Sequence, residues 1–103
     1  MALTPEKKVK NKVVLLLKEH DVYYFFPATY GMGRSGVPDI ICCFGGHFVG
    51  IECKAGKNKA TPLQLHELAA IRKAGGTTFI INEENVGVLA EYLRDNEHLH
   101  NRL

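Results

Sequence analysis

Two apolar, β-prone runs dominate the hydrophobic pattern of the chain, Ile40–Phe44 and Phe48–Ile51, and the dipeptide Gly45-Gly46 lies between them. Glycine supplies the positive φ angles that a tight reverse turn requires, so the pattern predicts a β-hairpin. A loop of two residues and a loop of four give the same register. In that register Asp39 lies opposite Glu52, just beyond the paired runs.

Three segments with apolar residues at helical spacing predict helices. The first begins at Pro5 after Thr4 as N-cap and ends near His20, the second covers Pro62–Lys73, and the third covers Val86–Arg94. The residues expected to face the core are Val9, Val13, Val14, Leu16 and Leu17 in the first helix, Leu65, Leu68, Ala69 and Ile71 in the second, and Val86, Leu89, Ala90 and Leu93 in the third.

Two further β-prone runs complete the predicted fold. Val22–Phe26 is a strand that ends before Pro27, and Thr77–Ile81 is a short buried strand. The order is therefore α-β-β-β-α-β-α, with a polar tail from about Asp95 to the end. A helical crossover joins the hairpin to Thr77–Ile81, so that strand should pair in parallel with a hairpin strand. The expected class is α/β, a mixed sheet flanked by helices.

Composition indicates one soluble globular domain over residues 1–103. The apolar fraction is 46% and the charged fraction 23%. No run approaches the ~20 apolar residues of a membrane span, and the first residues do not form a signal peptide. The three cysteines are an odd number without metal-type spacing. We therefore expect a reducing, intracellular location in the cytoplasm.

Charge is distributed unevenly along the chain. Residues 1–60 carry a net +4 and residues 61–103 a net −2, from Lys and Arg against Asp and Glu. A positive surface beside an acidic pocket suits a polyanionic substrate. The lysines of the first helix, taken alone, are better explained as a solvated helix face.

The predicted register gathers three charged residues at one end of the hairpin. Residues directly opposed across two strands share a face, with Cβ atoms roughly 5 Å apart, so Asp39 and Glu52 are neighbours. Lys54 projects from the same face, two residues beyond Glu52. One interpretation is a solvated salt cluster. The other is a divalent-metal site, with carboxylates as hard oxygen ligands and the lysine beside the reactive water.

Two other residues bear on this cluster. Glu6 precedes Val9 by three positions, which places it on the apolar side of the first helix and predicts a third carboxylate aimed at the hairpin acids. The alternative is an acid in the first turn, stabilised by the helix dipole. Cys53 points to the opposite face from its neighbours Glu52 and Lys54, so it is predicted to be a core residue.

Glycine-rich and basic segments flank the acids. The loop Ala28–Val37 contains three glycines, and Tyr30, Arg34 and Ser35 are its polar candidates for phosphate contacts. The linker Ala55–Ala60 offers Lys57 and Lys59. Gln64 occupies the capping-box position of the second helix, and its place near Lys54 leaves a role beside the site open.

The pattern Pro38-Asp39, then Glu52-Cys53-Lys54, on an α-β-β-β-α-β core resembles the PD-(D/E)xK nuclease superfamily. Within that superfamily, the run from Gly33 to Ile40 and the later Thr61–Gln64 are similar to the VRR-NUC (virus-type replication–repair nuclease) domain. The resemblance covers roughly residues 4–93. The chain is little more than that domain, and in this it is similar to the stand-alone versions carried by phages and some bacteria.

The resemblance implies a restriction-endonuclease-like fold and hydrolysis of DNA phosphodiester bonds with Mg²⁺ or Mn²⁺. It implies that Asp39, Glu52 and the Cys53 carbonyl bind the metal, with Glu6 assisting. Lys54 would orient the attacking water or stabilise charge on the phosphate, and Gln64 matches a polar residue that follows the motif. It also implies a homodimer that acts in DNA repair on branched DNA, such as four-way (Holliday) junctions.

Other functions remain open from the sequence. A restriction-type endonuclease would cut plain duplex, but 103 residues leave little room for a separate base-reading element. A non-catalytic nucleic-acid-binding module would need the basic loops and not the acids. A small protein–protein adaptor would need no convergent carboxylates.

Overall fold

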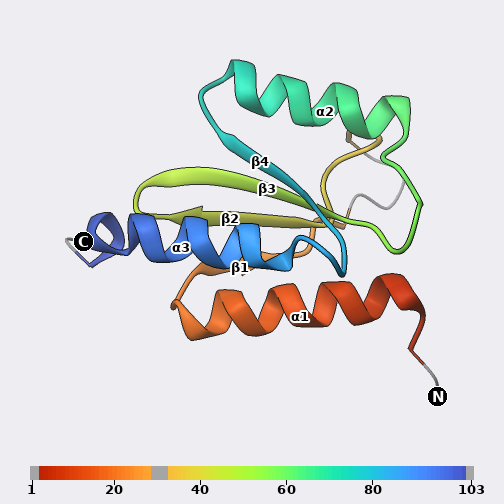
Figure 1. Cartoon of the computed structure of the whole chain (residues 1–103). Helices are drawn as coiled ribbons and strands as arrows, with labels where there is room; N and C mark the ends of the chain where they lie inside the picture. The colour runs from red at the N-terminus through yellow and green to blue at the C-terminus, as the bar shows by residue number, and fades with distance from the viewer. Residues whose placement is uncertain (1–2, 29–32, 102–103) are drawn as a thin grey trace.

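The computed structural model describes residues 3–28 and 33–101. Its elements follow the predicted order (Figure 1). They are α1 (Pro5–Glu19), β1 (Tyr23–Phe25), β2 (Ile40–Phe44), β3 (His47–Cys53), α2 (Pro62–Lys73), β4 (Thr77–Ile81) and α3 (Val86–His100). No helix within the described ranges is long and apolar enough to cross a membrane.

The four strands form one mixed sheet in the order β1-β2-β3-β4. β2 pairs antiparallel with β1 and β3, whereas β3 and β4 are parallel, as the helical crossover predicted. Phe44 lies opposite His47, and Ile40 lies opposite Ile51, which confirms the predicted hairpin register. β4 is an edge strand and only partly buried, because Ile80 is 39% exposed.

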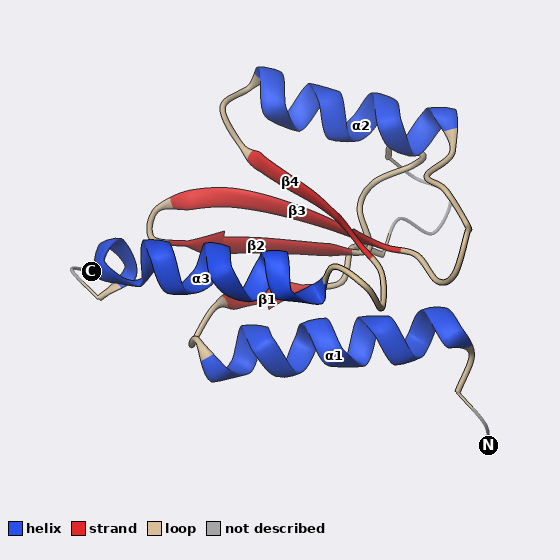
Figure 2. Cartoon of the chain, viewed as in Figure 1, coloured by secondary structure: helices blue, strands red, loops and turns tan. Residues whose placement is uncertain are grey.

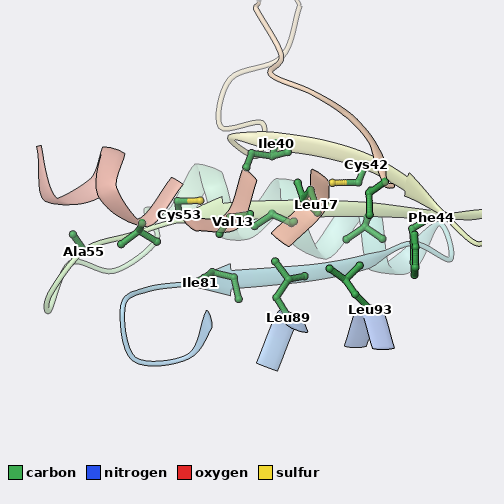
Figure 3. Close-up of a cluster of buried hydrophobic side chains, with 14 residues drawn as sticks. Val13, Leu17, Ile40, Cys42, Phe44, Cys53, Ala55, Ile81, Leu89 and Leu93 are labelled. Atoms are coloured by element: carbon green, nitrogen blue, oxygen red, sulfur yellow. The ribbon is translucent and has the colours of Figure 1, made fainter. Parts of the chain in front are cut away.

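Helices cover both faces of the sheet, with α2 on one side and α1 and α3 on the other (Figure 2). The larger core lies between the sheet and the α1–α3 pair. Figure 3 shows side chains from β2, β3 and β4 meeting side chains from α1 and α3 in this core. Its fully buried members include Val13, Ile40, Ile51 and Leu89.

Cys53 belongs to this core, as its strand position predicted, and it is completely buried. Burial raises the pKa of the Cys53 thiol to about 12, so the side chain stays neutral at physiological pH. The side chain of Cys53 therefore cannot contact a ligand on the opposite face of the sheet, and only its backbone could do so.

The first helix begins as the sequence predicted. Thr4 is the N-cap, and its hydroxyl accepts a hydrogen bond from the backbone N–H of Lys7 at 3.2 Å. Pro5 opens the helix, where a missing N–H costs nothing. Val9, Val13 and Leu17 are buried, so α1 lies along the sheet with a defined rotation.

The buried face of α2 differs from the predicted one. Leu65 is 48% exposed and Ala69 is also exposed, whereas Leu68 and Glu67 are buried. Ile71 completes the inward side, where its side chain approaches Gly50 on β3. The prediction is confirmed for Leu68 and wrong for Leu65 and Ala69. The charged residue Glu67 is buried at a position that an apolar stripe would fill.

The segment from Asp95 to His100 is helical, although the sequence predicted a polar tail from about Asp95. α3 continues to His100, although the sequence predicted its end at Arg94. The His100 ring stacks on Phe44 with centroids 4.5 Å apart, and His100 also bonds the backbone of Gly45 and Asp21. These contacts with the hairpin turn stabilise the last turns of the helix, which their own polar composition does not favour.

Candidate active site

Asp39 and Glu52 are held together by reciprocal contacts at the open end of the hairpin. The backbone N–H of Asp39 donates to Glu52 Oε1 at 3.2 Å. The backbone N–H of Cys53 donates to Asp39 Oδ2 at 2.8 Å. The two acids therefore lie opposite each other, as the register predicted, and each is fixed by the other strand.

Glu52 is the more deeply buried acid of this pair. It is only 1% exposed, and it lies with Gly50 on the face of the sheet that α2 covers. Burial and the charge of Asp39 raise the pKa of Glu52 to about 7, although Lys54 acts in the opposite direction. The fold thus holds a carboxyl group where ionisation is costly.

Lys54 is the counter-charge in this cluster. Its Nζ lies 3.4 Å from Glu52 Oε2, and its side chain is 13% exposed. The backbone N–H of Lys54 donates to the carbonyl of Ile81 at 2.9 Å, which continues the parallel ladder past Cys53. The lysine therefore starts from a rigid strand end, beside the acids where the sequence placed it.

The donor set fits a hard divalent cation. Glu52 Oε2 is buried and has no hydrogen-bond partner among the described residues. Mg²⁺ is typically held by one or two carboxylates together with waters and substrate phosphates, so Asp39 and Glu52 suffice as side-chain ligands. No group of three His, Cys, Asp or Glu side chains within the described ranges is placed to hold a metal.

Glu6 lies beside this cluster but is not a buried part of the α1 stripe. It is exposed, contrary to the inward position that its spacing predicted. It lines a small hollow of about 170 Å³ together with Thr4, Lys7, Lys10 and Asp39. The first turn of helix extends beyond the packed part of α1, which leaves Glu6 facing this hollow rather than the core.

Arg34 is paired with a residue that the sequence analysis missed. Its Nε and Nη2 donate to Glu67 Oε1 and Oε2 at 2.8 and 2.9 Å. The Glu67 side chain is 11% exposed, whereas that of Arg34 is 67% exposed. The hydrogen bonds from Arg34 lower the pKa of Glu67. Glu67 follows Gln64 by three positions, and only its distant partner explains its burial.

Gln64 has the capping role. Its Oε1 accepts from the backbone N–H of Thr61 at 2.9 Å, and its own N–H donates to the Thr61 hydroxyl at 3.2 Å. Within the described residues it makes no hydrogen bond to Asp39, Glu52 or Lys54. The structure therefore does not bring Gln64 into the acid cluster by direct contact.

The other predicted phosphate contacts lie on the surface around the site. They are Ser35, Lys57 and Lys59, which are all exposed. Tyr30 lies outside the described residues. The segment that carries the two lysines is anchored, because the backbone N–H of Gly56 donates to Glu83 Oε1 at 2.7 Å.

A larger groove of about 630 Å³ lies on the side of the sheet that α2 covers, and neither Asp39 nor Glu52 lines it. Residues of β1, β2, β3 and α2 line it, with the Arg34–Glu67 pair among them. Its remaining lining is almost entirely apolar and includes Phe25, Ile41 and Phe48. It contributes no carboxylate to the Asp39–Glu52 cluster.

Comparison with known proteins identifies the fold of the chain. No family model matches the chain, and no curated protein matches it. Among solved structures, the chain is similar to a "VRR_NUC domain protein", with 22% sequence identity and a TM-score of 0.69. The match covers 96% of this chain and 92% of the other. The chain thus has the fold of a VRR-NUC domain, a restriction-endonuclease-like arrangement with a mixed four-stranded sheet.

Proposed function

We propose that this protein is a metal-dependent DNA endonuclease of the VRR-NUC type within the PD-(D/E)xK superfamily. The observation that carries the proposal is the buried carboxylate of Glu52 beside Asp39 and Lys54. Its Oε2 accepts no hydrogen bond from a described residue and is ion-paired with Lys54. An acid that only formed a salt cluster would gain more from exposure to water. The similar "VRR_NUC domain protein" supports the same assignment through its fold and its name.

Asp39 and Glu52 would hold Mg²⁺ or Mn²⁺, with the Cys53 carbonyl as a third ligand. When bound, the cation would neutralise the phosphate and favour ionisation of the attacking water. Because Glu52 Oε2 accepts no hydrogen bond from a described residue, it could bind a cation without breaking one, although Lys54 would then share this oxygen with the metal. The bond from Cys53 to Asp39 Oδ2 restricts the rotation of that carboxylate.

Lys54 would act on the phosphate and on the attacking water. Its ammonium group lies at the edge of the acid cluster and is tied to Glu52 at 3.4 Å. A fixed positive charge next to a phosphate that gains negative charge in the transition state lowers the barrier. Glu6 lines the hollow next to Asp39, from which it can accept a proton or orient a water.

For the substrate, we propose branched DNA, with the four-way junction as the leading candidate. Symmetric cleavage of such a junction needs two active sites that face opposed strands, and a two-fold dimer supplies them most simply. The edge strand β1 is a candidate dimer surface, because Tyr23 is 68% exposed and Phe25 is 47% exposed.

The test uses labelled four-way junction, flap and plain duplex of matched sequence, each with and without Mg²⁺. We expect cleavage only with the metal, with the junction cut fastest. Equal cleavage of plain duplex would favour a restriction-type enzyme. Tight binding without cleavage of any substrate would instead favour a non-catalytic module.

Light scattering at micromolar concentration tests the dimer. The expected mass is twice that of the 11.5 kDa chain. A monomer that still makes paired, symmetric nicks in the junction would contradict the dimer.

A further inference from the structure

The ion pair between Arg34 and Glu67 is asymmetric in its exposure. Glu67 is almost buried on α2, whereas Arg34 comes from the glycine-rich loop and is two-thirds exposed. A purely structural pair would gain little by leaving the guanidinium in water, since exposed ion pairs contribute about 0–1 kcal/mol. The arrangement fixes one end of the pair and presents the other to solvent.

Within the described part of the chain, one edge of the guanidinium has no partner. An arginine has five N–H donors in a planar fork. Glu67 accepts from Nε and from one N–H of Nη2, which together form the side edge of that fork. The two N–H groups of Nη1 and the second one of Nη2 make no hydrogen bond to another described residue. Because the guanidinium is planar, this end edge points away from Glu67, and its spacing matches two oxygens of a phosphate.

The loop that carries Arg34 also contacts α2 at Gly36. A Cβ on Gly36 would lie 2.7 Å from the backbone carbon and oxygen of Leu63, so the backbones of the loop and of α2 are in direct contact there. Arg34 precedes Asp39 by five residues, which limits their separation to roughly 18 Å. The free edge therefore lies within a few nucleotides of a phosphate bound at the acids.

We propose that Glu67 is a positioning residue for DNA, which holds Arg34 so that its free edge binds a backbone phosphate near the cleaved bond. This inference rests on the proposed nuclease function. It adds a phosphate contact whose strength depends on an acid that itself never touches DNA.

The direction in which replacement of Glu67 changes the affinity for DNA distinguishes a positioning role from a simple effect of charge. Removal of a negative charge from a DNA-binding surface normally strengthens binding, because the protein becomes more positive. If Glu67 positions Arg34, its replacement has the opposite effect. A glutamine offers one acceptor and no charge, so the arginine gains rotational freedom that it must lose again on binding.

The experiment measures the affinity of the full-length protein for a four-way junction in Ca²⁺, a divalent ion used here to prevent cleavage, over a range of salt concentrations. The variants are Arg34→Ala, Glu67→Gln and the double variant. Glu91→Gln is the matched control, since Glu91 is an exposed acid on a helix without a hydrogen bond or ion pair to another described residue. Thermal melting establishes that each variant is folded.

We expect Arg34→Ala to bind about tenfold more weakly and to reduce the salt slope by about 0.9. Glu67→Gln should bind about threefold or more weakly, Glu91→Gln should bind no more weakly than wild type, and the double variant should match Arg34→Ala. If Glu67→Gln fails to fold, Arg34→Lys replaces it. Lysine keeps the charge but not the fork, so this variant should bind almost as weakly as Arg34→Ala.

Two outcomes would overturn the inference while the proposed function stands. One is wild-type or tighter binding by Glu67→Gln, or by Arg34→Lys where that variant replaces it. The other is an equal loss from Glu67→Gln with and without Arg34. A wild-type protein that binds no DNA would overturn the proposed function as well.

Discussion

The backbone N–H of Asp39 donates to Glu52 Oε1 across the end of the hairpin, and the 3.2 Å contact holds two acids side by side. Such a pair repels unless a proton or a cation is shared between them. Lys54 compensates only in part, because the pKa of Glu52 is still raised to about 7. The apo protein thus contains an acid poised between its two protonation states near neutral pH.

The raised pKa of Glu52 predicts how the free energy of unfolding changes with pH. The folded-state pKa of Glu52 lies above its ordinary value of 4.5, so the folded state binds this proton more tightly than the unfolded state does. The contribution is fully present below about pH 4.5 and is lost as the pH rises through about 7. The loss amounts to something on the order of 3 kcal/mol. Urea unfolding of metal-free protein between pH 4.5 and 8 measures it.

Glu52→Gln supplies the comparison, because glutamine has nearly the same shape and does not titrate. The free energy of unfolding of this variant should therefore not show the decrease between about pH 4.5 and 7 that is due to Glu52. Parallel curves for the variant and the wild type would show that Glu52 has an ordinary pKa.

Lys54→Met is expected to slow cleavage by about 10²–10³-fold in single-turnover assays, since one fixed charge at the reacting group contributes roughly 3–4 kcal/mol. It should also weaken metal binding near pH 7, because Lys54 lowers the pKa of Glu52 and its loss leaves more of the acid protonated. Metal binding should recover at higher pH, whereas the cleavage rate should not. An unchanged rate would make Lys54 only an ion-pair partner.

Gly36→Ala should disturb the loop that leads into Asp39. A Cβ at Gly36 meets the Leu63 backbone at 2.7 Å, whereas one at Gly33 meets no atom of another described residue within 4 Å. Both glycines have positive φ, so alanine costs about 1–2 kcal/mol of strain at either position. Gly36→Ala should therefore be about 1–3 kcal/mol less stable than Gly33→Ala in urea unfolding. Equal stability would mean that the contact between loop and helix is loose.

The hairpin and its acid pair could be predicted from sequence because their determinants are local. Two β-prone runs around Gly45-Gly46 set the register, and the register alone brings Asp39 to Glu52. The crossover rule then predicted that β4 pairs in parallel with one of the hairpin strands, and the structure shows that this strand is β3. Period-two alternation likewise placed Cys53 in the core.

Features that depend on distant partners could not be predicted. Glu67 is buried because Arg34 reaches it from a loop 33 positions earlier, and a charged residue gives no sign of this in a helical pattern. The last turns of α3 are helical because His100 packs on Phe44. In both cases a polar residue is fixed by a tertiary contact, and hydrophobic periodicity contains no information on such contacts.

Titration of the metal-free protein with Mn²⁺ in a calorimeter, at pH 8, tests whether Asp39 and Glu52 bind a metal. Wild type should bind the ion, and Asp39→Asn should bind at least about tenfold more weakly, because it loses a charged ligand but keeps an acceptor for the Cys53 N–H. Asp95→Asn is the control, since Asp95 is an exposed acid on α3 outside the site. We expect this control to bind Mn²⁺ like wild type. Equal binding by Asp39→Asn and wild type would show that Asp39 and Glu52 do not form a metal site.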